Sequence, residues 1–475
     1  MLKVYNTKEE VFNDALAFMD KRLLDVMEKD DVAEAKRDIE KHGKKRKGFL
    51  GQLVQKYVFN QALVDNRHEA DFKIAGVELK TTPIKKHKSK EYAVKERLVF
   101  SMIDYVSVVL EDWEHSSFLD KNKLILLMFY LYESDLSLLE YKFKFLYELD
   151  LVNKISAEDA LQIKNDWEYI INKIKRGEAH LLSEGETFYL GACTKAANSS
   201  ITRKQPNSDI QAKPRAFSLK QNYLNFILHE KIMGLEGDIQ SISEKGKTID
   251  KSVDDRLAPF IGMSDKQILS EIGLKVNKKT KQYKRLLANL MLGISANKVE
   301  EFEKSNVTMK VVVLESNGKL KESISFPYFN YKQILKQKWE ETNFFKMLEE
   351  DRFLFIIFRK DKDKTKDLIH FEGYKFWNFP ASDMNYAESV WSKTKKLVDK
   401  GKIVKEIKKY KNGKERRFTF FPTSKFNGVA HVRPHGKDSS DVIELPTEDE
   451  FTGSKFYTKH CFWLNADYIR KNLEK

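Results

Sequence analysis

The fold of the first half of this chain is indicated by the stretch Asp71-Phe-Lys-Ile-Ala-Gly-Val-Glu-Leu-Lys80. Its second half alternates between apolar and charged residues. Side chains two residues apart in a strand share one face, so Glu78 and Lys80 project together. Val77 and Leu79 then face the core. The pattern predicts a strand at 76–82 that carries charged groups on one side.

The first half of the same stretch supplies a second carboxylate. Ala75-Gly76 offers a tight turn, and a hairpin there would bring Asp71 close to Glu78. Two carboxylates can hold Mg²⁺, which neutralises a phosphodiester and activates water. A lysine such as Lys80 can orient that water or offset developing negative charge. By itself this spacing is also typical of a solvated strand face, and that alternative stays open here.

The surrounding sequence predicts an α/β domain, with a mixed sheet flanked by helices. Helices are expected at 8–42, 51–60, 157–176 and 221–228. Strands are expected at 71–74, 76–82, 98–105 and 123–132, the last of them strongly apolar and central.

An internal repeat extends this prediction to the second half. Similar segments recur in the same order, namely 71–80 with 301–310, 95–105 with 321–331, 118–127 with 347–356, 167–177 with 391–401, and 216–223 with 461–468. The conserved order favours two domains of one fold over two unrelated α/β domains. We expect an N-terminal domain at 1–235, a polar linker at 236–255 and a C-terminal domain at 256–475.

Composition restricts the class of partner. The formal net charge is +14 and is spread along the chain, which favours a polyanion such as nucleic acid. Two cysteines, Cys193 and Cys461, are too few for a disulfide framework or a zinc site, and a reducing cytoplasm fits. The beginning has no apolar signal segment, and no stretch is long enough to span a membrane. We find no Walker A sequence and no histidine arrangement typical of zinc or His-Cys nucleases.

Several motifs together resemble one family. They are Lys47-Gly-Phe-Leu-Gly-Gln-Leu53, Gly76-Val-Glu-Leu-Lys-Thr-Thr-Pro83, Trp113-Glu-His-Ser116, Asp166-Trp-Glu168, Lys195-Ala-Ala-Asn198 and Phe217-Ser-Leu-Lys220. In this order they resemble the MutH-like DNA endonucleases, which include mismatch-repair nicking enzymes and type II restriction enzymes of the same fold. The whole chain is similar to the tandem-domain, Sau-type restriction enzymes that cut at GATC. The resemblance implies two tandem restriction-endonuclease-like domains.

The resemblance also implies catalytic roles. Asp71 and Glu78 would bind Mg²⁺, Lys80 would lie beside the attacking water, and Lys121 falls on a further active-site lysine. One position departs from the pattern, because Gln55 stands where the family has a glutamate. Glutamine can orient water but adds no negative charge, so a second metal would bind more weakly.

The DNA-contacting positions implied by the resemblance lie later in the chain. Lys195, Asn198, Arg203 and Lys220 match the family's DNA-reading loops in the first copy. In the second copy, Arg433 of Val432-Arg-Pro-His435 is a candidate for guanine or phosphate contact.

The second copy has lost the catalytic set. The repeat places Glu301 at Asp71, Thr308 at Glu78, Lys310 at Lys80, Glu350 at Lys121 and Ala288 at Gln55. We therefore expect the second copy to bind DNA as an effector without cutting it. A structural or dimerisation role is the alternative.

The sequence thus predicts a type II restriction endonuclease that cuts double-stranded DNA at a short palindrome, GATC by resemblance, with Mg²⁺. A cognate DNA methyltransferase acting on the same site is the expected partner. A nicking repair endonuclease and a DNA-binding protein with weakened catalysis stay open as alternatives. So does the choice between a monomer and a form that dimerises or loops two sites.

Overall fold

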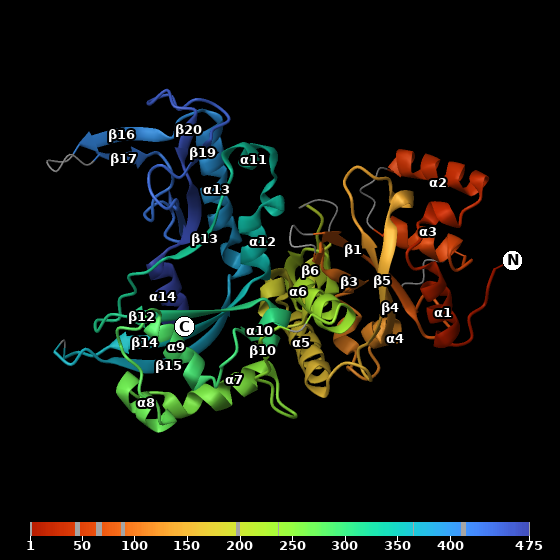
Figure 1. Ribbon diagram of the computed structural model, residues 1–475, viewed down its shortest axis with the longest axis horizontal. Helices are drawn as coiled ribbons and strands as arrows, with labels where there is room; N and C mark the ends of the chain where they lie inside the picture. The colour runs from red at the N-terminus through yellow and green to blue at the C-terminus, as the bar shows by residue number, and fades with distance from the viewer. Residues whose placement is uncertain are drawn as a thin grey trace. The chain divides into compact units, whose positions relative to one another are not determined.

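The computed structural model describes residues 2–42, 48–62, 69–86, 91–195, 200–235, 237–363, 365–409 and 415–474 (Figure 1). The chain forms two compact units. Unit 1 comprises Met1–Ser252 together with Ala296–Val307, and unit 2 comprises Val253–Ser295 together with Thr308–Lys475.

Unit 1 contains two main sheets. The first has the order β2-β1-β4-β5, with strands Tyr92–Val94, Glu78–Lys86, Leu124–Leu131 and Lys142–Asp150. β1 runs parallel to β4, with Glu78 opposite Ile125, and the other pairs are antiparallel. The second sheet is antiparallel and has the order β3-β9-β6, with strands Leu98–Met102, Arg215–Leu219 and Leu190–Thr194.

The helices of unit 1 flank these sheets. They are α1 (Lys8–Phe18), α2 (Lys29–His42), α3 (Phe49–Tyr57), α4 (Ser117–Asn122), α5 (Ala157–Lys175), α6 (Gln221–Phe226) and α10 (Glu300–Ser305). A π-helical turn, Ile227–Ile232, continues α6. The mixed α/β architecture predicted from the sequence is confirmed.

Some element boundaries differ from the predictions. The helix expected at 8–42 is divided into α1 and α2, since Asp20 adopts a left-handed backbone with φ of 62°. The expected strand at 71–74 is reduced to one bridge between Phe72 and Val77. The reason is the turn between them, where Gly76 has φ of 65° and leaves room for a single pair. The strand expected at 98–105 ends at Met102.

Unit 2 repeats this topology. Its first sheet has the order β12-β14-β15, with strands Val307–Leu314, Arg352–Lys360 and Ile369–Asn378. Its second has the order β13-β21-β18, with strands Ile324–Tyr328, His460–Leu464 and Ala430–Pro434. These orders correspond to β1-β4-β5 and β3-β9-β6 of unit 1. The prediction of two tandem domains of one fold is confirmed.

The helices of unit 2 follow the same plan. α9 (Tyr283–Met291), α12 (Asn343–Glu350), α13 (Met384–Asp399) and α14 (Ala466–Glu474) occupy the chain positions of α3, α4, α5 and α6. Unit 2 adds α7 (Ile249–Leu257), which begins in unit 1, α8 (Asp265–Ile272) and α11 (Tyr331–Lys336). It also has a hairpin after α13, formed by β16 (Val404–Lys409) and β17 (Glu415–Thr419), which extends from the rest of the unit in Figure 1.

The distance in sequence from Trp167 to Gly177 equals that from Trp391 to Gly401, and the structure explains why each segment ends in glycine. Gly177 and Gly401 each follow the long helix of their unit and adopt positive φ of 74° and 64°. A Cβ atom at either glycine would lie under 3.0 Å from a backbone oxygen, that of Asn207 or Glu448. Both copies therefore require glycine here, because a loop carbonyl passes directly over it.

Each unit has its own apolar core. These cores contain buried aromatic residues from both copies, among them Trp167, Trp391, Phe217 and Phe462. Cys193 is a free cysteine and is buried. Within the described residues no helix is long and apolar enough to cross a membrane.

One short segment leaves unit 2 and packs in unit 1. The chain passes from α9 back to unit 1 at residues 296–307, which contain β11 (Lys298–Val299) and α10. β11 pairs with β10 (Ile239–Gln240), inside the stretch expected to be a linker. α10 packs against α6, and its Lys304 forms a buried ion pair with Asp159 of α5 at 2.7 Å. Unit 1 is therefore completed by a segment that comes after α7, α8 and α9 in the sequence.

Candidate active site

The two carboxylates predicted as metal ligands lie together where β1 begins. The backbone N–H of Asp71 donates to Glu78 Oε2 at 3.1 Å, and the N–H of Leu79 donates to Asp71 Oδ2 at 3.0 Å. The Phe72–Val77 bridge closes the turn between them. Local hydrogen bonds therefore hold both acids on one side of a tight turn.

Two lysines converge on the same carboxylate. Lys80 Nζ lies 2.6 Å from Glu78 Oε1, and Lys121 Nζ, from the end of α4, lies 3.9 Å from the same oxygen. Glu78 is only 2% exposed. Burial raises the pKa of its carboxyl group, while the two ammonium groups act in the opposite direction. The structure thus brings together the four residues that the sequence nominated.

The fifth nominated residue, Gln55, lies on α3, which packs against β1. The helix approaches closely at Gly51, where an added Cβ would lie 3.6 Å from Thr81 Oγ1. Gln55 is one helical turn further along the same side and is half-buried. Gln55 therefore places a neutral side chain on the helix that packs against β1.

The donor set fits a hard divalent cation. Mg²⁺ is commonly bound by one or two carboxylates, with water and phosphate completing its octahedron. Asp71 and Glu78 supply these two carboxylates from adjacent positions. No cluster of three or more histidine, cysteine or acidic residues suited to a metal occurs in the described part of the chain. The site therefore suits a metal shared with a phosphate rather than one enclosed by protein.

The residues expected to contact DNA are placed differently from one another. Lys195 follows β6 and is half-buried, with its backbone N–H bonded to Pro214 O at 2.8 Å. Arg203 is exposed at the start of β7 (Arg203–Gln205), which forms a hairpin with β8 (Ser208–Ala212). Asn198 lies outside the described residues.

Lys220 does not reach the surface of unit 1. It is 3% exposed, and its ammonium donates to the carbonyl oxygens of Thr187 at 2.6 Å and Ser305 at 3.2 Å. This lysine ties β9 to α10 in the structure, so its ammonium is committed to protein carbonyls. Lys220 is therefore not available to contact DNA in this structure.

Arg433 of unit 2 is exposed at the end of β18. Its guanidinium lies over the ring of Trp463, at 5.2 Å from the centroid. Stacking of this kind orients a guanidinium while leaving its edge open to phosphate or guanine.

A supporting residue of unit 1 was not predicted from its chemistry. Asp166, in the motif Asp166-Trp-Glu168, accepts hydrogen bonds from the backbone N–H groups of Phe188, Tyr189 and Leu190, at 3.1, 2.6 and 2.9 Å. It thereby fixes the beginning of β6, the strand that ends at Thr194 directly before Lys195. The motif Asp166-Trp-Glu168 marked Asp166 in the sequence. Its structural role could not be predicted, because the N–H groups that it binds lie more than twenty residues later in the chain.

The counterparts in unit 2 have diverged in structure as well as in sequence. Glu301 lies in α10 of unit 1, where it accepts from Ser241 Oγ and from the N–H groups of Ile242 and Ser243. Thr308 is exposed on β12, and Ala288 is fully buried on α9. Lys310 keeps the position of Lys80 without an equivalent of Glu78. The described part of unit 2 thus lacks the pair of acids seen in unit 1.

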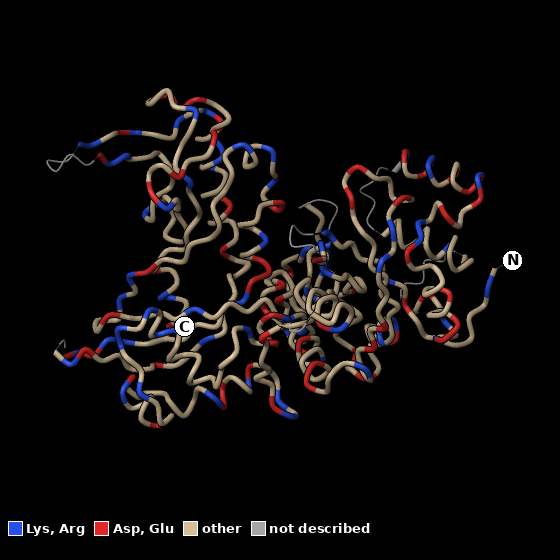
Figure 2. Tube along the Cα trace, viewed as in Figure 1, with Lys and Arg blue, Asp and Glu red and all other residues tan. Residues whose placement is uncertain are grey.

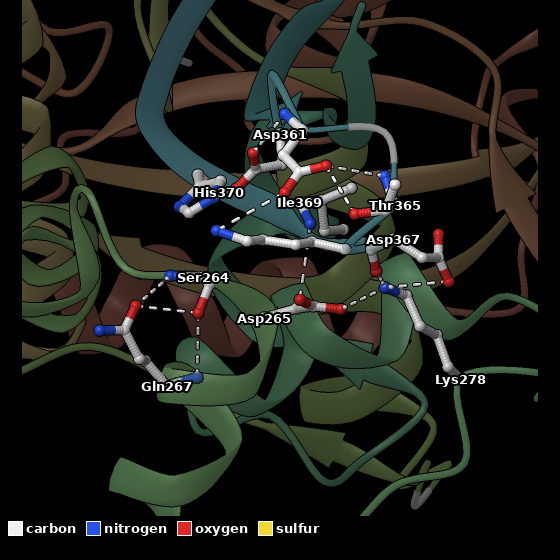
Figure 3. Close-up of polar contacts among 11 residues, drawn as sticks. Ser264, Asp265, Gln267, Lys278, Asp361, Thr365, Asp367, Ile369 and His370 are labelled. Atoms are coloured by element: carbon white, nitrogen blue, oxygen red, sulfur yellow. Dashed lines mark hydrogen bonds and ion pairs between the residues drawn. The ribbon is translucent and has the colours of Figure 1, made fainter. Parts of the chain in front are cut away.

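A second polar cluster in unit 2 serves to position α9. Asp265, which is 1% exposed, accepts from Tyr283 Oη at 3.0 Å. It also pairs with Lys278 at 3.1 Å (Figure 3). Tyr283 is the first residue of α9, and burial beside Asp265 raises the pKa of its hydroxyl. The cluster anchors α8 and α9 next to Ile369 of β15.

Basic residues are distributed over the whole described chain, with acidic residues interspersed (Figure 2). This distribution agrees with the expectation that the positive excess is not confined to a tail.

Comparisons with known proteins identify the family. The family model described as DNA mismatch repair enzyme MutH matches two segments, 61–166 and 292–389, one in each repeat. The chain is 34% identical to the type II restriction enzyme Sau3AI of Staphylococcus aureus, covering 100% of this chain and 99% of that enzyme. It is 29% identical to the DNA mismatch repair protein MutH of Shewanella woodyi (strain ATCC 51908 / MS32), over 39% of this chain and 77% of that protein. The chain therefore belongs to the MutH-like family of restriction endonucleases.

Proposed function

We propose that this protein is a type II restriction endonuclease that cuts both strands of DNA at a short palindrome, with GATC as the expected sequence. The observation that carries the proposal is the convergence of Asp71, Glu78, Lys80 and Lys121 at the beginning of β1. The full-length similarity to a type II restriction enzyme favours double-strand cleavage. The alternative of a nicking repair enzyme has weaker support, since similarity to the mismatch repair protein MutH of Shewanella woodyi extends over only 39% of the chain.

In the proposed mechanism Asp71 and Glu78 would hold Mg²⁺. When bound, the metal would lower the pKa of a water molecule and neutralise charge on the scissile phosphate. Lys80, whose ammonium already lies 2.6 Å from Glu78, would orient the attacking water from the same strand face. Lys121, on α4, would stabilise the negative charge that develops on phosphate oxygens.

The arrangement around Glu78 explains how this acid is kept ready. Burial alone favours its protonated form, which binds metal poorly. The charges of Lys80 and Lys121 favour the carboxylate and offset part of that penalty. The backbone N–H of Asp71 adds a hydrogen bond to Oε2. We infer that these three groups keep Glu78 available as a ligand.

The reaction is tested by incubating the pure protein with plasmid DNA that contains GATC, with and without Mg²⁺. We expect discrete linear fragments that require the metal. Nicked circles alone would favour the repair-type alternative. Retained binding without cleavage would favour a DNA-binding protein, the outcome suggested by Gln55.

Site assignment is tested with Glu78→Ala. We expect loss of at least about 100-fold in cleavage, because the metal loses one of its two protein ligands. Glu133→Ala, an exposed acid in the same unit, is the matched control and should cleave normally. Cleavage by Glu78→Ala at the control rate would refute the assignment.

For unit 2 we propose a DNA-binding effector role, with Arg433 among its contacts. Lys195, Asn198 and Arg203 are the proposed contacts of unit 1. The effector role predicts faster cleavage of plasmids with two sites than with one, and Arg433→Ala should reduce that difference. Equal cleavage of both plasmids by the unaltered protein would favour the structural or dimerisation alternative. A cognate DNA methyltransferase and a cytoplasmic location also stay proposals.

A further inference from the structure

Unit 2 carries a pair of basic residues where unit 1 carries its acidic turn. Lys310 lies on β12 at the position of Lys80, and Thr308 on the same face replaces Glu78. Arg285 enters from α9, the counterpart of α3, and its Nη1 donates to the carbonyl oxygen of Met309 at 2.6 Å. That carbonyl belongs to the residue directly before Lys310. A site that is acidic in one copy has therefore become basic in the other.

The charge of Lys310 is not neutralised as that of Lys80 is. Lys80 has a carboxylate oxygen at 2.6 Å. Lys310 is half-buried, and its ammonium makes no ion pair or hydrogen bond with any described residue. Burial and the nearby charge of Arg285 lower its pKa, and Asp351 opposes them with a smaller effect. Burial also lowers the pKa of Arg285. Arg285 and Lys310 are thus neighbouring cations that are partly shielded from water, and nearby carboxylates do not fully compensate their positive charge.

Such an arrangement costs stability unless an anion completes it. An uncompensated buried charge is unfavourable, and two like charges side by side add to the cost. The small side chain of Ala288, one turn after Arg285 on α9, supplies no acid in their place. The exposed hydroxyl of Thr308 offers a further hydrogen-bond donor on the same strand face. These features suit a tetrahedral oxyanion.

We propose that Arg285 and Lys310, with Thr308, form a phosphate-binding site in unit 2, at the position that corresponds to the catalytic centre of unit 1. The ligand is a phosphate group, and a phosphodiester of DNA is the source that the repeat favours. In this arrangement the degenerate copy holds a backbone phosphate where the intact copy would cut one. The proposal rests on the effector role proposed for unit 2 and specifies how that unit grips DNA.

The test uses the full-length protein with Glu78→Gln, which keeps DNA intact during binding measurements. In this background Arg285→Gln and Lys310→Gln are combined, and duplex affinity is measured by fluorescence anisotropy over a range of salt concentrations. We expect at least about tenfold weaker binding and a salt slope reduced by about 1 to 2, as for the loss of one or two phosphate contacts. Lys319→Gln, an exposed lysine beyond the other end of β12, is the matched control.

Binding of inorganic phosphate, measured by calorimetry, separates the two sources of the ligand. Loss of duplex binding in the double variant supports a DNA phosphate. Loss of inorganic phosphate binding with unchanged duplex binding supports the same site with a free phosphate as its ligand. If affinity for both ligands and the salt slope equal those of the Lys319→Gln control, the proposed site is overturned.

A stability measurement distinguishes a binding site from a structural one. Lys310→Met removes an uncompensated cation, so we expect its melting temperature to equal or exceed that of the parent while duplex binding weakens. A lower melting temperature with unchanged binding would overturn the proposal. The cleavage assays on the unaltered protein and on Glu78→Ala test the nuclease assignment independently. Failure of that assignment is therefore distinguishable from failure of the phosphate-binding site.

Discussion

At the scale of single residues, charge and burial together determine what each polar group can do. Glu78 and Lys310 occupy neighbouring positions in the two copies and are both withdrawn from water. Glu78 is balanced by two ammonium groups, whereas Lys310 faces a second cation. The corresponding segments at the beginning of β1 and β12 therefore favour a divalent cation in unit 1 and an anion in unit 2.

Gln55→Glu should strengthen metal binding in unit 1. The substitution adds a negative charge on α3 beside β1, one turn after the contact of Gly51 with Thr81. We expect the Mg²⁺ concentration for half-maximal cleavage to fall by about tenfold, since charge count is a main determinant of affinity for hard cations. Gln52→Glu, exposed on the same helix, is the control. An equal shift in both variants would show a general charge effect and not a local one.

His460 should make unit 2 sensitive to mild acid. It is 2% exposed, and burial lowers its pKa to about 4, while its Nδ1 lies 2.8 Å from Thr458 O. Because the folded pKa is lower than the unfolded one, the unfolded chain gains protons first as pH falls. The free energy of unfolding should therefore decrease between pH 6.5 and about 4, by at most about 3 kcal/mol.

Urea unfolding followed by tryptophan fluorescence at pH 7 and pH 5 tests this expectation. His460→Gln removes the titrating ring and should flatten the pH dependence over that range. An identical loss of stability in the variant and the parent would assign the acid sensitivity to other groups.

At the scale of elements, α10 is held in unit 1 by a buried polar network around Lys304. Its Lys304 pairs with Asp159 at 2.7 Å and with Glu300 at 2.6 Å, and Tyr223 Oη also donates to Asp159 at 2.7 Å. The ammonium also lies 4.6 Å from the ring centroid of Phe226 on α6. A buried network of this kind fixes a helix in one place because a displaced helix would leave charges unpaired.

Lys304→Ala should destabilise unit 1 by about 3 kcal/mol, because Asp159 would remain buried without its cation. The loss is measured by urea unfolding with tryptophan fluorescence. Lys298→Ala removes an exposed ion pair with Glu303 near the beginning of the same segment and should change stability by less than about 1 kcal/mol. Equal effects of the two substitutions would contradict a structural role for the buried pair.

At the scale of the whole molecule, unit 1 is discontinuous in sequence. Its last piece, Ala296–Val307, comes after the first part of unit 2. A chain cut at the end of the first sequence repeat would therefore lack α10 and expose the buried groups of Asp159 and Lys220. Point substitutions in unit 2 consequently test its role more cleanly than deletion of residues 256–475.

Two fragments measure this dependence directly. We expect residues 1–307 to melt at least about 5 °C above residues 1–252, because only the longer fragment contains α10 and β11. Both melting temperatures are obtained by circular dichroism. Equal values would mean that α10 contributes nothing to the stability of unit 1.

Short-range pattern determined much of this protein. The alternation at 76–82, the turn at Gly76 and the repeated order of segments predicted the acidic turn, the mixed α/β fold and two tandem copies. These features depend on neighbours within a few residues or on similarity between the copies, both of which are visible in the sequence.

Tertiary structure decided the rest. It buried Lys220 against carbonyls, brought Arg285 next to Lys310, and joined α10 to unit 1 through an ion pair between residues 145 positions apart. These contacts depend on which charged groups lie close together once the chain has packed, and a local sequence pattern does not contain that information.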